Sequence, residues 1–213
     1  MRLYDYFRST AAYRVRIALN VKGIDYESVP VNLRDGEQGG EGYAVVNPQH
    51  LVPVLEHEGR RLTQSLAICE YIDELQPSPA LLPGDRAGRA RVRAIAQSIA
   101  CDIHPIDNLR VLKYLTGRLG VSEDDKLAWY HHWIHEGFRA IEATLADAPE
   151  TGTYCHGESV TLADVCLVPQ VYNANRFEVD LSAYPTIRRI NDACLALAPF
   201  DRARPERQPD APS

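Results

Sequence analysis

The spacing of apolar and polar residues divides the chain into two parts of different character. Up to about residue 75, patterns typical of short strands alternate with patterns typical of helices. We expect strands at 3–7, 26–33, 51–55 and 61–63, a mobile polar loop at 34–42, and helices from Ser9–Thr10 to Gly23 and from a Ser65 cap to Leu75. These elements predict a small mixed α/β domain.

A proline-rich connector at 76–84 leads into a region that is helical almost throughout. We expect helices at 87–115, 123–145, 162–176 and 187–197, the third beginning at a capping box formed by Thr161 and Asp164. The proline-rich tail from Asp201 onward is expected to wrap the surface or to be partly disordered. The sequence therefore predicts an α/β domain at residues 1–80 and an all-α domain at residues 85–213.

Composition and charge remove several classes of protein. The chain has 213 residues and a formal charge of −6, with no basic stripe of the kind that nucleic-acid binding requires. No apolar run approaches the roughly 18–20 residues of a membrane span, and the N-terminus lacks the layout of a signal peptide. The five cysteines form no C-x-x-C motif, so we expect free thiols in a reducing cytoplasm.

Two helix starts in the first part are suited to binding an anion. Arg8-Ser9-Thr10 and Gln64-Ser65 each place a hydroxyl before a helix, where backbone amides and the helix dipole favour negative charge, although plain capping is the simpler explanation of either alone. Twenty of the 23 basic residues are arginines, the side chain that binds planar anions best, but a biased codon supply would also explain that excess. Val52-Pro53 opens a strand, and a cis bond there would turn the Val52 amide outward toward a peptide-like ligand.

The second part contains one polar cluster and one histidine cluster. His104, Asn108 and Arg110 could face a cleft, with Pro105 starting or kinking the helix. His131 and His135 lie one helical turn apart, but without a third ligand nearby we expect a solvated helix face and no metal.

Residues 6–19, YFRSTAAYRVRIAL, closely resemble the signature of the zeta-class glutathione transferases, which include maleylacetoacetate and maleylpyruvate isomerases. The resemblance covers nearly the whole chain in the expected order. It continues through Asn47–Gln49, Val52–Pro53, Gln64–Ile68, Asp102–Pro105, Leu167–Val171, Arg176–Phe177, Val179–Leu181 and Gln208–Asp210.

This resemblance implies a glutathione transferase fold: a thioredoxin-like N-terminal domain with a cis Pro53, an all-α C-terminal domain, and a homodimer. Glutathione would lie in the cleft, with Ser9 and Thr10 hydrogen-bonded to its sulfur, while Arg8 and Arg176 would bind the carboxylates of the substrate. The other implied glutathione contacts are Ala11, Gln38, Gln49, the Val52 backbone, Gln64 and Ser65 at the γ-glutamyl end, and Asp102, His104, Asn108 and Arg110 from the helical side.

The activity implied by the resemblance is glutathione-dependent cis–trans isomerisation of maleylacetoacetate or maleylpyruvate, in tyrosine and phenylalanine or in gentisate breakdown. Hydrogen-bond donors at a helix start lower the pKa of a thiol and so raise its thiolate fraction. Family members usually carry Cys, Ser or Thr where this chain has Ala11. Ser9 is therefore the first candidate for stabilising the thiolate, and Thr10 the second.

Two other functions stay open. The same thiolate would serve a detoxifying transferase or an α-haloacid dehalogenase. The second alternative is a catalytically silent protein of this fold that serves protein contacts. Retention of Ser9, Gln64, Ser65, Arg8 and Arg176 together argues against it, because a scaffold does not require them; failure to bind immobilised glutathione would revive it.

Overall fold

The computed structural model describes residues 1–212, which form two compact units. The first comprises Met1–Leu81 and the segment from Leu195 to Pro212, and the second comprises Leu82–Cys194. The segment after Leu195, expected with the helical domain, thus belongs to the first unit.

A four-stranded mixed sheet with the strand order β2-β1-β3-β4 forms the centre of the first unit. The strands are β1 (Arg2–Asp5), β2 (Glu27–Pro30), β3 (Val54–His57) and β4 (Arg60–Thr63). The two N-terminal strands are parallel, whereas β1 pairs antiparallel with β3, with Leu3 opposite Leu55. Both of these leucines are fully buried, so the apolar alternation of the sequence sets which face of the sheet carries the core.

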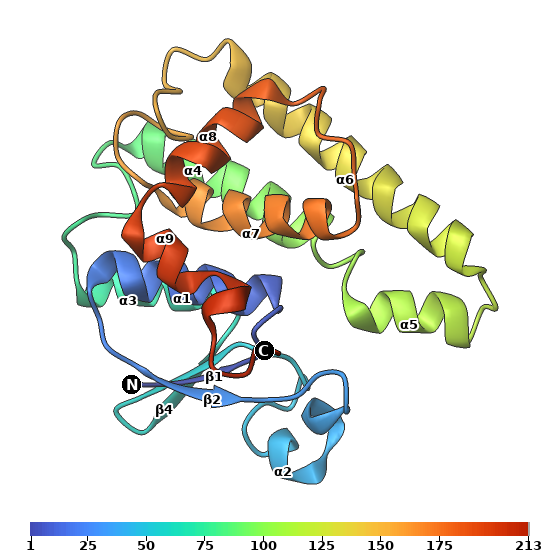
Figure 1. The fold of residues 1–213 in the computed structure, drawn as a ribbon. Coiled ribbons are helices and arrows are strands. Elements are labelled where there is room, and N and C mark those ends of the chain that lie inside the picture. The colour runs from blue at the N-terminus through green and yellow to red at the C-terminus, as the bar shows by residue number, and fades with distance from the viewer. Residues whose placement is uncertain (213) are drawn as a thin grey trace. The chain divides into compact units, whose positions relative to one another are not determined.

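Helices α1 (Thr10–Lys22) and α3 (Ser65–Leu75) pack against each other on one face of this sheet (Figure 1). Gly23 ends α1 in the left-handed conformation, with φ 66°, as the sequence predicts. The expected loop at 34–42 contains a 3-10 turn, η1 (Glu37–Gly39), and leads into the one-turn helix α2 (Glu41–Ala44). The resulting order is that of a thioredoxin-like domain.

From Leu195 to Pro212 the C-terminal segment packs on the first unit, which agrees with the expected surface wrap rather than with partial disorder. It forms α9 (Ala198–Ala203) and a 3-10 turn, η3 (Pro205–Arg207). Two side chains of α1 hold it: Asn20 Nδ2 donates to the Pro199 carbonyl at 3.0 Å, and Arg16 Nε donates to the Ala203 carbonyl at 3.0 Å. Burial of the Phe200 ring adds a hydrophobic contribution that a freely solvated tail would lack.

The second unit is helical. Its helices are α4 (Arg86–Gln97), the π-helix η2 (Ser98–Ile103), α5 (Leu109–Gly117), α6 (Glu123–Ala146), α7 (Leu162–Arg176) and α8 (Pro185–Leu195). Its core lies along α7, nearly all of which is buried and which packs against α4 (Figure 1). Thr161 and Asp164 form the expected capping box of α7, with the Thr161 amide donating to Asp164 Oδ2 at 2.8 Å.

The single helix expected at 87–115 is wrong, because the chain is interrupted between Ile103 and Leu109. Pro105 has no amide to donate to the preceding turn. Asn108 then begins a new helix by accepting a hydrogen bond from the Arg110 amide at 3.2 Å. Across residues 1–212, none of the helices combines the length and the apolar character needed to cross a membrane.

Candidate active site

The turn between β1 and α1 carries Ser9, which is the N-cap of α1. Its Oγ accepts a hydrogen bond from the Ala12 amide at 3.2 Å. Because capping uses an oxygen lone pair, the hydroxyl proton stays available to donate to an anion. Capping and anion binding are therefore compatible at Ser9. Thr10, the first helical residue, is 6% exposed, and Ala11 adds no polar group.

Arg8 lies beside this cap with its guanidinium partly withdrawn from water. Its Nη2 donates to the Tyr6 hydroxyl at 3.4 Å, and the group lies 4.8 Å from the centroid of the Phe7 ring. The Arg8 Nε is buried and has no hydrogen-bond partner among residues 1–212. A buried donor without a partner is costly, so the Arg8 Nε has a hydrogen bond left to donate to an external acceptor.

The start of α3 differs from the expected cap. Gln64, not Ser65, occupies the N-cap position, with φ 68° and no capping hydrogen bond from its side chain. Ser65 is the first helical residue, is 7% exposed and accepts a hydrogen bond from Arg14 Nη1 at 3.2 Å. The first amides of α3 thus receive no side-chain cap and are left for an external acceptor. Gln64 Nε2 donates to Gln49 Oε1 at 3.1 Å, which links two of the implied glutathione residues.

The Val52–Pro53 bond is cis, as the resemblance implies. The Tyr43 hydroxyl and Asn47 Nδ2 both donate to the Leu51 carbonyl, at 2.9 and 2.7 Å, and so hold the chain just before Val52.

Gln38 comes from the segment between β2 and α2. Its carbonyl accepts a hydrogen bond from His50 Nδ1 at 2.7 Å, while its Oε1 is buried without a partner among the described residues. Gln38 therefore has an acceptor left for a ligand.

The remaining predicted residues belong to the second unit. Asp102 is exposed on η2, and His104 follows its end half-buried. Asn108 caps α5, and Arg110 is exposed in the first turn of that helix. Arg176 ends α7, where its Nη2 donates to Asn173 Oδ1 at 3.1 Å and its guanidinium lies 4.4 Å from the centroid of the Phe177 ring.

Asp107 is a polar residue of this segment that sequence reasoning did not single out. It is only 4% exposed, and neither carboxylate oxygen has a hydrogen-bond partner within residues 1–212. Burial raises the pKa of this carboxyl to about 8. No sequence signal marks it, because its neighbours Asp102, His104 and Asn108 are equally polar.

His131 and His135 of α6 are half-buried and bonded to neighbouring elements, which corrects the expectation that they lie on a solvated face. His131 Nε2 lies 2.7 Å from the Phe177 carbonyl, and His135 Nδ1 lies 2.8 Å from the Tyr184 hydroxyl. Both imidazoles thus join α6 to its neighbours within the second unit. Among residues 1–212, no three acidic, histidine or cysteine side chains are grouped so that they could hold a metal ion.

Known proteins resemble this chain over its full length. Residues 1–74 match the glutathione S-transferase N-terminal domain. A probable maleylacetoacetate isomerase of Vibrio cholerae is 52% identical over 98% of this chain and 97% of its own length. A holo structure of maleylpyruvate isomerase, a bacterial zeta-class glutathione S-transferase, is 48% identical with a TM-score of 0.98 and full coverage of both chains.

A maleylacetoacetate isomerase of Methylobacterium extorquens, solved with bound malonate and glutathione, is 41% identical with a TM-score of 0.97 and again covers both chains completely. Identity of about 50% over the whole chain is far above what a shared fold alone requires. The chain belongs to the zeta class of the glutathione S-transferase family.

Proposed function

We propose that this protein is a glutathione-dependent cis–trans isomerase that converts maleylacetoacetate or maleylpyruvate to the fumaryl isomer. The observation that carries the proposal is the β1–α1 turn, where the unused proton of the Ser9 hydroxyl lies next in sequence to Arg8 with its unpartnered Nε. Relatives of this chain bear both isomerase names, and one of them was solved with glutathione bound.

The residues present fit glutathione. The uncapped start of α3 offers backbone amides to the γ-glutamyl carboxylate. Gln64 and Ser65, the N-cap and the first residue of this helix, would bind the same end of glutathione. The Val52 backbone would pair with the cysteinyl part, and Gln38 and Gln49 would lie along the tripeptide. As the family resemblance implies, we assign Asp102, His104, Asn108 and Arg110 to glutathione as well.

When bound, glutathione supplies a reversible sulfur nucleophile that turns the maleyl double bond into a rotatable single bond and then departs. Ser9 donates a hydrogen bond to the sulfur, with Thr10 as the second candidate, and the dipole of α1 adds positive potential there. Arg8 and Arg176 hold the carboxylates and face the negative charge that develops on the substrate carbonyl.

The decisive experiment mixes the purified protein with glutathione and each maleyl keto acid. We expect a glutathione-dependent loss of the maleyl chromophore, and the ratio of kcat/KM for the two substrates identifies the preferred one. No loss with either substrate would refute the isomerase. Chloride release from an α-chloro acid in that case would identify the dehalogenase instead.

We also propose that the protein is a homodimer, as its family resemblance implies. Sedimentation velocity should give a mass of twice 23.8 kDa, and a monomer at micromolar concentration would contradict the proposal.

A further inference from the structure

A buried ion pair lies beneath the β1–α1 turn. Arg16 is completely buried, and its Nη1 donates to both carboxylate oxygens of Asp5, at 2.8 and 2.9 Å. Its Nη2 donates to the Phe7 carbonyl at 2.9 Å, and its Nε donates to the Ala203 carbonyl of the C-terminal segment. One guanidinium therefore bonds to the end of β1, the turn and the C-terminal segment.

The two residues before Arg8 have every polar backbone atom bonded. The Tyr6 amide donates to Asp5 Oδ1 at 2.6 Å, and the Tyr6 carbonyl accepts from the Ser9 amide at 2.8 Å. The Phe7 carbonyl accepts from Arg16, and the Phe7 amide donates to Asp210 Oδ2 at 2.9 Å. The acceptor for Phe7 thus comes from a residue 203 positions further along the chain.

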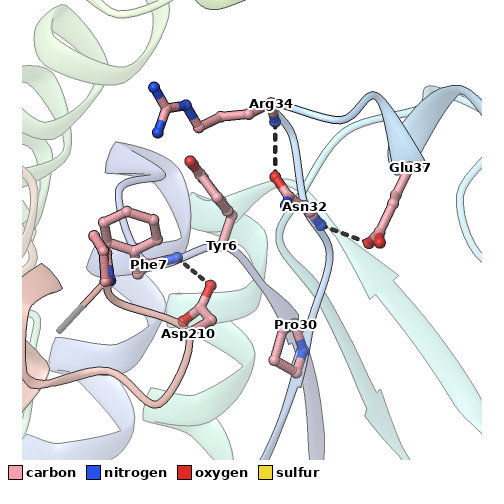
Figure 2. A pocket seen from close by; sticks show the side chains of 8 residues that line it. Tyr6, Phe7, Pro30, Asn32, Arg34, Glu37 and Asp210 are labelled. Atoms are coloured by element: carbon pink, nitrogen blue, oxygen red, sulfur yellow. Dashed lines mark hydrogen bonds between the residues drawn. The ribbon is translucent and has the colours of Figure 1, made fainter.

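Packing does not hold this turn on all sides. Tyr6 and Phe7 border a hollow of about 340 Å³, which is also lined by Asn32, Arg34, Glu37 and Asp210. Figure 2 shows the Asp210 carboxylate on this hollow, reaching the Phe7 amide. Where no side chain fills the space, directional hydrogen bonds must fix the backbone, and the bond to Asp210 fixes it on the open side.

We infer that Asp210 is a positioning residue of the active site, through which the C-terminal segment fixes the turn that carries Arg8 and Ser9. The inference rests on the proposed function of that turn. A displacement of about 1 Å in groups that orient a reaction can cost about 100-fold in rate. The bound tail therefore contributes to turnover through the Phe7 backbone, which positions Arg8 and Ser9.

The test compares Asp210→Ala with Asp210→Asn, whose amide oxygen still accepts from the Phe7 amide. We expect Asp210→Ala to lower kcat by about 10-fold or more and to raise the pKa of bound glutathione, while the Kd of glutathione changes less than about 3-fold because α3 is untouched. Asp210→Asn should recover most of kcat.

The matched control is Asp201→Ala in the same segment. Among residues 1–212 the Asp201 carboxylate forms ion pairs with the half-exposed Arg204 and the exposed Arg207. Such surface pairs contribute little to stability, so kcat should stay at the wild-type value.

Amide hydrogen exchange of the peptide that contains Phe7 gives a readout independent of turnover. Exchange should accelerate in Asp210→Ala and not in Asp210→Asn. If Asp210→Ala keeps the kcat and the amide exchange of the wild type, the inference is overturned. It is also overturned if both Asp210 variants lose kcat equally while the exchange of the Phe7 peptide stays unchanged. An inactive wild type would instead refute the proposed function, and the exchange comparison would still decide whether Asp210 fixes the turn.

Discussion

At the scale of single residues, Ser9 shows how one side chain serves folding and chemistry together. Its oxygen accepts from the Ala12 amide, and its proton is free to donate. The capping role uses the oxygen and the donor role uses the proton. A Ser9 variant loses both roles, so a control variant that loses only a helix cap elsewhere separates their effects.

We predict that Ser9→Ala destabilises the protein by about 1 kcal/mol, the usual cost of losing an N-cap, and lowers kcat by at least about 10-fold as the pKa of the bound thiol rises. Thermal denaturation and ultraviolet titration of the thiolate measure the two effects. The control is Asp85→Ala, which removes the cap of α4, where Asp85 accepts from the Gly88 amide at 2.8 Å. It should cost similar stability with kcat unchanged. An unshifted thiol pKa in Ser9→Ala would exclude the assigned role.

Arg8 illustrates the cost of an unpartnered donor. Replacement by Lys keeps the charge but loses the planar fork, so we expect Arg8→Lys to raise KM for the maleyl keto acid by about 10-fold, and Arg8→Ala by more, with glutathione affinity nearly intact. Arg176→Ala should behave in the same way. Steady-state kinetics together with calorimetric titration of glutathione separate the two ligands. A large loss of glutathione affinity would contradict both assignments.

At the scale of elements, the interruption between η2 and α5 places Asn108 at a helix start rather than inside a helix. Its Oδ1 caps α5, which leaves its Nδ2 to donate to a ligand. The capping role of Asn108 and its proposed binding role thus use different atoms of one amide.

An aspartate is as good an N-cap as an asparagine but has no amide donor. We therefore predict that Asn108→Asp keeps the wild-type melting temperature but weakens glutathione binding several-fold. Asn108→Ala should lose both binding and about 1 kcal/mol of stability. Wild-type glutathione affinity in both variants would show that Asn108 is only a cap.

At the scale of the whole molecule, the free energy of unfolding depends on pH through Asp107, a buried carboxyl group without a hydrogen-bond partner among residues 1–212. The pKa of Asp107 is raised to about 8 in the folded protein, whereas it is near 4 in an unfolded chain. Between these values the unfolded chain releases a proton that the folded protein retains. Stability from this group is therefore complete below about pH 4 and is lost as the pH rises toward 8.

We predict that Asp107→Asn removes this dependence. The difference between the free energy of unfolding of Asp107→Asn and that of the wild type should increase between about pH 4 and pH 8, because the wild type loses stability there. The increase should reach up to about 1.4 kcal/mol per pH unit and level off above about pH 8. Denaturant melts at several pH values measure the difference. Asp25→Asn, at an exposed carboxylate, should run parallel to the wild type. A parallel profile for Asp107→Asn would contradict the prediction.

The sequence alone was sufficient for the fold class and for the family. The alternation around Leu3 and Leu55, the Gly23 stop and the Thr161–Asp164 box are local patterns, and local patterns are readable because adjacent residues determine them. The motif from Tyr6 to Leu19 identified the family for the same reason.

Only the tertiary structure decided that Gln64 rather than Ser65 precedes α3, that the tail joins the first unit, and that Arg16 and Asp210 bond to the β1–α1 turn. In the sequence, Arg16 is one cation among the apolar residues of a helix, and Asp210 is one acid in a polar tail. Their roles depend on acceptors and donors as far as 203 positions away, and no local pattern records which distant groups a folded chain brings together.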